Sequence, residues 1–456
     1  SQPLALSFSQ DRLWLASQVD PDSSQYSLPL CAKIVGRLDV PALRAAFAAL
    51  VRRHETLRTT FALGPDGKAI QVVHQSGGPV FALREAGSDP EAQAIIERLI
   101  GQALDIEKGP VFAADLMRTG REQAFLLLRI HHIACDGWSL QILIRDLVQL
   151  YEREAGYALS QPEIPELEIQ YADYAAHQRA WVDSPALGRE LDYWGARLSR
   201  PPSSLRLPGD ARPGRGPGSS SKLEADSLLH VLSEQARAGL RRVARECGAT
   251  TYAVGLAAFC LLVERLCGQQ EFIVGTPVAN RLDSSTHDLV GFFVNTLPIR
   301  VDLSRSKNFR ELVLQTRELV ASAHEHQRAP FALVAEAAGS GQPLFRVWFA
   351  FHEDQEASGK IGEARWSLHP VDHDANLFDL TLSMSNQSDA MTAKLEFGAH
   401  HWSTDAMAAH VGAWDETVKQ ATEQPDASLR GRTPGERGPH DLDQPSFSFE
   451  ALGDPT

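Results

Sequence analysis

Apolar residues recur along the chain in two patterns, one typical of amphipathic helices and the other of buried strands. The segment DVPALRAAFAALVRRHETLRTTF has helical spacing, and Asp39 with Pro41 is typical of a helix start. The run AFLLLRI predicts a strand buried on both faces. In the next segment, DGWSLQILIRDLVQLYERE, one predicted helix face carries Leu140, Leu143, Ile144, Leu147, Leu150 and Tyr151. The sequence therefore predicts a buried strand followed by a helix, with residues 131–135 between the two.

The same alternation returns later in the chain. A helical block from EIQYADYAAHQRAWV to ELDYWGARLS ends at RPPSSLRLPGDARPGRGPGSSSK, which is dense in Pro, Gly and Ser and predicts a linker or surface loop. Two helices are predicted in SEQARAGLRRVARECGATTYAVGLAAFCLLVERL, and strands in EFIVGTPVANR, FFVNTLPIRVDL and LFRVWFAF. The sequence thus predicts an α/β fold with an N-terminal lobe (1–200), a linker (201–222), a C-terminal lobe (223–425) and an extended tail (426–456).

Composition narrows the class of protein. The 456 residues are 43% hydrophobic and 22% charged, as in ordinary globular proteins, and the net charge of −14 argues against nucleic acid or an anionic membrane as partner. Five cysteines without a C-x-x-C spacing argue against a disulfide framework. The sequence shows no signal-peptide pattern, and its most apolar segment is too short to span a bilayer. We therefore expect a cytoplasmic protein.

Two adjacent histidines, His131 and His132, stand at the end of the predicted buried strand. Neighbouring side chains in a strand point to opposite faces, so the two imidazoles do not share one site and a metal centre there is disfavoured. A neutral imidazole near pH 7 accepts a proton from an attacking amine or hydroxyl. On these residues alone a second interpretation stays open, in which the histidines merely end a strand, one buried and one solvated.

Two further residues follow the histidines closely. Asp136 is too near in sequence to be a triad carboxylate, and we expect it to hold the turn or to pair with an arginine. Gly137 permits a tight turn and an open backbone N–H near a reacting carbonyl. Because the chain has no G-x-S-x-G elbow, a serine-nucleophile hydrolase is disfavoured.

The pattern H-H-x-x-x-D-G followed by Trp-Ser resembles the core motif of condensation domains of nonribosomal peptide synthetases. Other segments resemble the remaining motifs of that family, in the family's order. These are LSFSQDRLW (6–14), RRHETLRTTF (52–61), YADYAAHQRAW (171–181), VGFFVNTLPIR (290–300), HQRAPF (326–331) and GQPLFRVWFAF (341–351). Seven ordered motifs over most of the chain make the resemblance specific.

The resemblance implies two chloramphenicol-acetyltransferase-like lobes in a V-shaped pseudo-dimer with a tunnel between them. It implies that His132 is catalytic, as general base or by positioning the nucleophile, and that His131 packs behind it. Asp136 is then structural and paired with Arg281, while the Gly137 N–H holds the donor carbonyl. Two supporting residues are also implied: Asn295 and Ser139 line the tunnel, with capping of the following helix as the alternative for Ser139.

The activity implied by the resemblance is acyl transfer. A carrier protein presents an aminoacyl or peptidyl thioester on its phosphopantetheine arm, and an amine or alcohol, carrier-bound or soluble, attacks it to form an amide or an ester. No cofactor or metal bound by this chain itself is expected. Two alternatives remain: a catalytically silent recruiting domain, although such relatives degrade the H-H-x-x-x-D-G motif, and a wax-ester-type acyl-CoA acyltransferase.

Departures from related patterns narrow the subtype. The glutamate motif of epimerisation domains is absent, and His131 stands where heterocyclisation domains carry aspartate. The D-F-G-W-G of plant-type acyl-CoA transferases is also absent. PDASLRGRTPGER resembles the beginning of a linker toward an adenylation domain, but no adenylation domain or carrier serine follows it. An excised domain and a free-standing condensation enzyme both stay open, and the ending HDLDQPSFSFEALGDPT favours the free-standing form. Free-standing relatives in enediyne pathways join a carrier-bound amino acid to a soluble alcohol.

Overall fold

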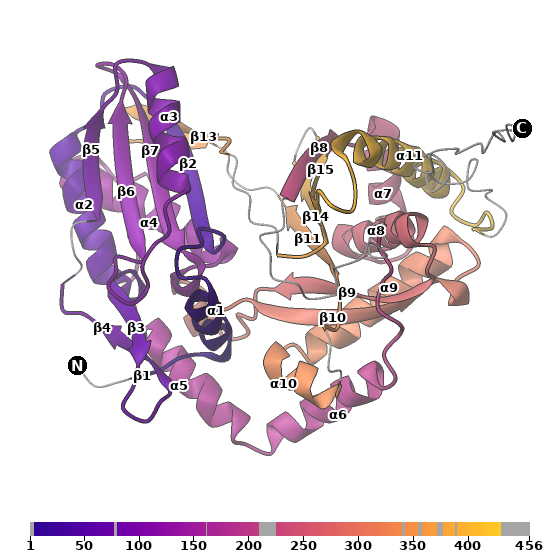
Figure 1. Ribbon diagram of the computed structural model, residues 1–456. Helices are drawn as coiled ribbons and strands as arrows, with labels where there is room; N and C mark the ends of the chain where they lie inside the picture. Colours follow the sequence, from indigo (N-terminus) through magenta and orange to yellow (C-terminus); the bar gives the residue numbers. More distant parts are fainter. Residues whose placement is uncertain are drawn as a thin grey trace, which may run out of the picture.

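Two lobes, each built on a six-stranded sheet, lie side by side in the computed structural model (Figure 1). The structure describes residues 4–76, 80–160, 162–208, 225–339, 343–353, 358–371, 377–387 and 390–429. At one end the lobes are bridged by helices α5 (Tyr171–Val182) and α6 (Ala186–Leu198), which follow each other along the lower edge of the figure. The predicted α/β class is confirmed, while the V shape and the tunnel stay predictions.

The first lobe contains the sheet that ends at the two histidines. Its strand order is β12-β13-β2-β7-β6-β5. The strands are β2 (Ser27–Val35), β5 (Phe81–Glu85), β6 (Phe112–Arg118), β7 (Gln123–His131), β12 (Ser358–Ile361) and β13 (Ala364–His369). Helices α2 (Val40–Arg53) and α4 (Gly137–Glu154) pack on one face and α3 (Asp89–Ile100) on the other. Strand β7 is therefore buried on both faces, as its continuous apolar run predicts.

Smaller elements complete this lobe next to the histidines. Strands β1 (Leu4–Ala5), β4 (Ala69–Val73) and β3 (Thr59–Leu63) form a separate sheet, with α1 (Phe8–Val19) and the 3-10 helix η1 (Glu55–Arg58) beside it. Gln10 of α1 donates from Nε2 to the carbonyl of Ile133 at 3.2 Å, so α1 is fastened to the turn after β7.

The second lobe has the strand order β10-β9-β11-β14-β15-β8. Its strands are β8 (Ala225–Val231), β9 (Glu271–Val278), β10 (Asn295–Asp302), β11 (Val347–Glu353), β14 (Leu380–Asn386) and β15 (Met391–Gly398). Its helices are α7 (Glu234–Glu246), α8 (Thr251–Cys267), α9 (Phe309–Glu325), α10 (Phe331–Ala337) and α11 (Thr404–Glu423); two 3-10 turns are η3 (Ser284–Thr286) and η4 (Leu303–Arg305). The most apolar segment of the chain is α8, which lies at the centre of this core.

One pairing contradicts the predicted boundaries of the lobes. Residues 223–425 were assigned to the C-terminal lobe, yet β12 and β13 in that range belong to the sheet of the first lobe. Strand β13 pairs antiparallel with β2, and its Trp366 is buried in the first core. The correction has a simple cause: the unpaired edge of β2 needs a partner, and local periodicity does not show which strand supplies it.

The predicted linker and tail are also more ordered at their beginnings than expected. Leu205 and Leu207, early in the predicted linker, are buried in the second core because they are apolar residues within an otherwise polar stretch. Asp426, at the start of the predicted tail, pairs with Arg310 of α9 at 2.8 Å. The rest of both segments, 209–222 and 430–456, lies outside the described residues. Among the helices that the structure describes, none is long and apolar enough to cross a membrane.

Candidate active site

The two adjacent histidines occupy different environments because the backbone changes between them. His131 is the last residue of β7, and His132 begins the 3-10 turn η2 (His132–Ala134). His131 is buried, and its Nδ1 accepts a hydrogen bond from the backbone N–H of Ile133 at 3.1 Å. His132 is only partly buried. The two rings thus have separate surroundings, but because the chain leaves the strand at His132 and not because of the strand alternation expected from the sequence.

The His132 ring is held in one tautomer. Its Nδ1 lies 2.8 Å from the carbonyl oxygen of Cys135. A carbonyl only accepts, so Nδ1 carries the hydrogen and donates it, and Nε2 keeps its lone pair. The backbone N–H of His132 donates to the carbonyl of Tyr26 at 2.7 Å, and the Phe292 ring lies 4.7 Å from the imidazole, centroid to centroid. The contacts fix the ring and leave a basic nitrogen available.

The surroundings of both histidines favour the neutral form. Burial, followed by the neighbouring charge of His132, lowers the pKa of His131 to about 3. Burial is also the largest cause that lowers the pKa of His132 below its usual 6.5, and the positive charge of Arg12 acts in the same direction. The Cys135 carbonyl and the Asp136 carboxylate oppose this shift without reversing it. At neutral pH His132 is therefore an unprotonated base.

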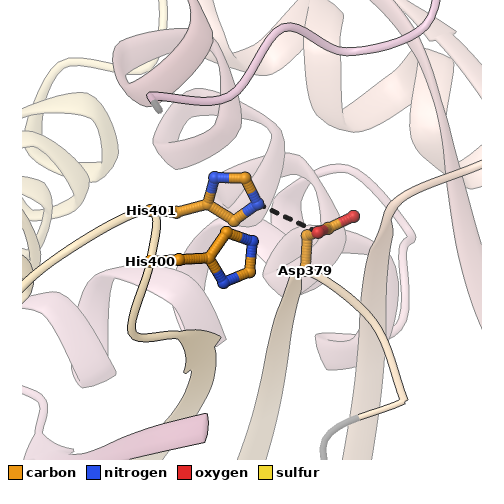
Figure 2. A group of neighbouring side chains, drawn as sticks. All are labelled: Asp379, His400 and His401. Carbon is orange, nitrogen blue, oxygen red and sulfur yellow. Dashed lines mark hydrogen bonds and ion pairs between the residues drawn. The ribbon is translucent and has the colours of Figure 1, made fainter. Parts of the chain in front are cut away.

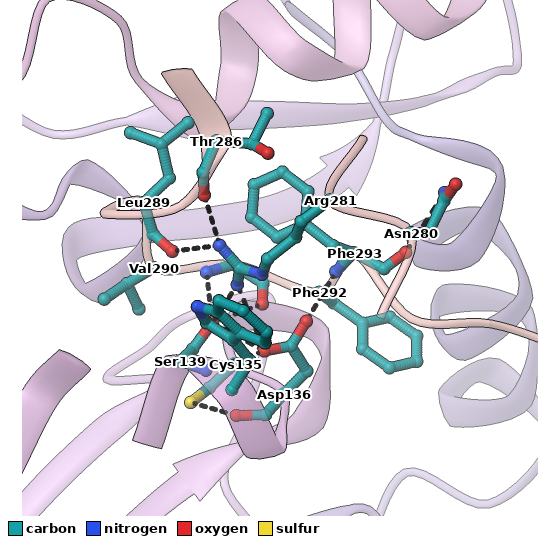
Figure 3. A network of polar contacts seen from close by, with 12 residues as sticks. Cys135, Asp136, Ser139, Asn280, Arg281, Thr286, Leu289, Val290, Phe292 and Phe293 are labelled. Atoms are coloured by element: carbon teal, nitrogen blue, oxygen red, sulfur yellow. Dashed lines mark hydrogen bonds and ion pairs between the residues drawn. The ribbon is translucent and has the colours of Figure 1, made fainter. Parts of the chain in front are cut away.

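Asp136 ties the start of α4 to a loop of the second lobe, as Figure 3 shows. Its Oδ1 accepts hydrogen bonds from the backbone N–H and the hydroxyl of Ser139 at 2.8 and 2.7 Å. Its Oδ2 accepts from the backbone N–H of Phe293 at 3.0 Å. The ion pair expected with Arg281 is present at 3.2 Å, between side chains that are 0% and 1% exposed. Asp136 is therefore a brace between distant segments, with no contact to the His132 ring among its described bonds.

Arg281 and Ser139 extend this brace. Arg281 donates from Nη1 to the carbonyl of Leu289 at 2.8 Å and to that of Thr286, and from Nη2 to Ser139 Oγ at 2.8 Å. Ser139 Oγ also contacts the carbonyl and the N–H of Gly291 at 2.9 and 3.1 Å. Ser139 is fully buried, and Asp136 rather than Ser139 caps α4. The alternative role of Ser139, helix capping, is therefore wrong, and its hydroxyl is bonded within the brace. The expected role in lining a tunnel stays a prediction.

Gly137 is the first residue of α4 and is exposed. It does not have a positive φ, so its backbone conformation is open to other residues as well. A Cβ built on it would meet nothing within 4 Å. What glycine provides here is open space beside the first N–H groups of the helix, which have no partner within the helix itself.

Asn295, which was expected to line the tunnel, is bonded to a loop of the second lobe. Its amide nitrogen donates to the carbonyls of Gln327 and Ala329 at 2.8 and 2.7 Å, and its oxygen accepts from the N–H of Phe331 at 3.1 Å. The side chain thus holds the loop between α9 and α10. Phe292, by contrast, contacts the His132 ring and was not singled out from the sequence. Phe292 lies within the motif VGFFVNTLPIR, and this position was the only feature of the sequence that pointed to a role near the site.

Comparison with known proteins identifies the family. The Condensation domain model matches residues 1–434. A linear gramicidin synthase of Brevibacillus parabrevis is 36% identical over 414 residues, which cover 86% of this chain and 8% of that protein. Malpibaldin synthetase of Mortierella alpina is 34% identical over 422 residues, which cover 90% of this chain and 8% of that protein. The chain thus spans less than a tenth of the length of these two synthetases.

Solved structures share the fold. The X-domain in a complex with OxyB from teicoplanin biosynthesis superposes with a TM-score of 0.82 at 24% identity, covering 94% of this chain and 95% of that one. SgcC5 from Streptomyces globisporus, solved with a naphthyl ethanediol and sucrose, has a TM-score of 0.77 at 23% identity, covering 93% and 100%. The chain belongs to the condensation domain family of nonribosomal peptide synthetases.

Proposed function

We propose that this chain transfers an aminoacyl or peptidyl group from a carrier-bound thioester to an amine, with His132 as the base. The observation that carries the proposal is the fixed tautomer of His132. His132 Nδ1 donates its hydrogen to the Cys135 carbonyl oxygen, 2.8 Å away. The lone pair on Nε2 is therefore available to accept a proton from the attacking group. The pKa of His132, lowered mainly by burial, keeps that lone pair free at neutral pH.

The reaction follows from this arrangement. The amine nitrogen attacks the thioester carbonyl carbon and passes its proton to Nε2 of His132. The new C–N bond forms, the C–S bond breaks, and the sulfur leaves with its electron pair. The imidazolium then returns the proton to that thiolate, which gives an amide, a free carrier thiol and a neutral His132. Holding both reactants next to one base supplies much of the rate, so no covalent enzyme intermediate is needed.

The first turn of α4 supports the negative charge that develops on the thioester oxygen. Gly137 and Trp138 begin the helix, so their N–H groups have no partner within it. The positive end of the helix dipole adds to their effect. Asp136 and Arg281 hold this helix start in place through the brace. The donor carbonyl is therefore assigned to the open space beside Gly137.

The carrier protein and its phosphopantetheine arm are part of the proposal. They supply the thioester, and this chain supplies the base and the helix start. An alcohol is the alternative acceptor, since SgcC5 was solved with a bound ethanediol. An alcohol would give an ester, with its proton passing to His132 in the same way. A recruiting domain without catalysis is the competing function, since the teicoplanin X-domain of the same fold was solved in complex with OxyB.

Intact-mass spectrometry of a loaded carrier protein tests the proposal. The carrier, bearing one of a panel of aminoacyl thioesters, is incubated with the chain and with amines and 1,2-diols. We expect a product mass for at least one pair and free carrier thiol in equal amount. In His132→Ala the rate should fall by about 10²–10⁴-fold, the usual contribution of a positioned general base.

His131→Ala is unsuitable as the control because that ring is buried. His324→Ala, at an exposed position of α9, is suitable and should retain full activity. Product formation at an unchanged rate in His132→Ala would overturn the assignment of the base. A chain that gives no product with any pair, yet binds a tailoring enzyme, would establish the recruiting function instead.

A further inference from the structure

A second pair of adjacent histidines, His400 and His401, lies in the other lobe. They follow β15 in a turn closed by a hydrogen bond from the N–H of His401 to the carbonyl of Gly398 at 2.8 Å. In a turn, neighbouring side chains are free of the alternation that separates them in a strand. Both rings therefore lie on the same side, facing Asp379, the residue before β14 (Figure 2).

The three side chains are close enough to hold one ion. One ring nitrogen of each histidine and one carboxylate oxygen of Asp379 all lie within 4.8 Å of one another. In zinc sites the metal lies 2.0–2.1 Å from a histidine nitrogen and 2.0–2.2 Å from a carboxylate oxygen, so two ligand atoms of one tetrahedral ion are about 3.4 Å apart. Rotation of the side chains would have to shorten the longest of the present separations by at most about 1.4 Å to close the set.

The hydrogen bonds of His401 suit a metal ligand. Its Nδ1 lies 2.6 Å from the carbonyl of Pro208, so this nitrogen carries a hydrogen and donates it. Its Nε2 lies 2.9 Å from Asp379 Oδ1, so a cation placed between them would be bound by both atoms. A histidine whose other nitrogen donates to a carbonyl is the usual arrangement of a metal ligand.

Arg346 completes the surroundings of the carboxylate. Its Nε donates to Asp379 Oδ2 at 2.8 Å, which leaves Oδ1 directed at His401. Ligating carboxylates are commonly held by such an outer hydrogen bond. Arg346 Nη2 also lies 3.4 Å from His401 Nε2, and an incoming ion takes the place of that long contact.

We propose that Asp379, His400 and His401 bind a divalent transition-metal ion, for which Zn²⁺ is the best fit. Two imidazoles and one carboxylate form a ligand set that zinc accepts, and a fourth position remains for water. Calcium and magnesium are excluded because they require mainly oxygen ligands.

The site would act as a clip on the connector between the lobes. Pro208 belongs to the segment that follows α6, and its carbonyl is held by His401. The same segment is held at the carbonyl of Leu205, which accepts from Arg346 Nη1 at 2.9 Å. The metal would thus fasten the connector, β14 and the turn after β15 to one point, away from the proposed base His132.

Isothermal titration of the full chain with Zn²⁺ tests the site, using tag-free protein treated with a chelator and dialysed. We expect one Zn²⁺ per chain and a rise in Tm that EDTA reverses. Asp379→Asn and His400→Ala should lose this uptake, and circular dichroism without metal checks that both remain folded. His324→Ala, an exposed histidine outside the cluster, should bind as the original chain does.

Two results would overturn the proposal. The first is no stoichiometric uptake of Zn²⁺, which would leave His401 as a hydrogen-bonded partner of Asp379 and Arg346. The second is uptake that persists unchanged in both Asp379→Asn and His400→Ala, which would place the ion elsewhere. A crystal grown with Zn²⁺ adds a direct measurement, since anomalous scattering should show one peak between the three side chains.

Discussion

At the scale of single residues, the chemistry of His132 depends on one backbone carbonyl. The 3-10 turn after β7 brings the Cys135 carbonyl 2.8 Å from Nδ1, which fixes both the ring and the tautomer. Asp136, the nearest carboxylate in sequence, is directed instead toward Arg281 and Phe293. The proposed base is therefore oriented by a neutral acceptor rather than by the carboxylate that follows it in the sequence.

This arrangement predicts the pH dependence of acyl transfer. Burial lowers the pKa of His132 below 6.5, and only the neutral ring accepts a proton. The rate should therefore be level near pH 7 and fall as the pH drops through an inflection below 6.5. The measurement is kcat/KM for the carrier thioester between pH 4.5 and 8, compared at equal concentrations of the unprotonated acceptor amine, since an α-amino group itself titrates near 7.7–8.0. An inflection clearly above 6.5 would show that His132 is not the titrating base.

The brace of Asp136 predicts a large loss of stability on its removal. In Asp136→Ala the guanidinium of Arg281, 1% exposed, is left buried without its carboxylate, which costs about 3–5 kcal/mol. Urea denaturation measures the change in the free energy of unfolding. Asp39→Ala is the matched control, because Asp39 caps α2 without a buried ion pair and should cost only about 1 kcal/mol. Equal losses in the two variants would show that the ion pair adds nothing beyond a helix cap.

At the scale of elements, the start of α4 combines a rigid brace with an open surface. Substitution of Gly137 by leucine separates the two roles. Since nothing lies within 4 Å of a Cβ at this position and φ is not positive, Tm should be unchanged, while the donor carbonyl loses its space. We expect kcat/KM to fall about 10- to 100-fold, as misplacement of a reactant does.

Gly188→Leu is the matched control for that variant. Gly188 is also helical, exposed and without neighbours within 4 Å of a Cβ, but it lies on α6. Its activity and Tm should both match those of the original chain. Equal activity in Gly137→Leu and Gly188→Leu would remove the start of α4 from the proposed site.

The elements differ in how far the sequence predicts them. Helices α2 and α4 and strand β7 follow from periodicity, because each buries a regular apolar face or run. The segment FFVNTLPIRVDL was predicted as strand from Phe292, but β10 begins only at Asn295. The preceding residues leave the strand because the N–H of Phe293 is bonded to Asp136. Such a contact joins residues 157 positions apart, and no local pattern contains it.

At the scale of the whole molecule, the second half of the chain completes the first sheet. Strands β12 and β13 leave the second lobe and add to the edge of β2, and Trp366 on β13 enters the first core. Composition alone does not reveal this crossing, because the Pro/Gly-rich linker marks only the first passage of the chain from one lobe to the other. The later passage to β12 and β13 has no such compositional signal. The stability of the first lobe should therefore depend on residues from both halves.

Trp366→Ala tests that dependence. Trp366 is 8% exposed and its indole lies against Gly359 of β12, so its loss should cost about 3–5 kcal/mol. Hydrogen exchange should become faster in β2 and β7, far from the substitution in sequence, while α8 in the second core stays protected. Trp138→Ala, 46% exposed, is the control and should leave exchange in β2 unchanged. Faster exchange confined to residues 358–369 would mean that the crossing strands only rest on the first lobe.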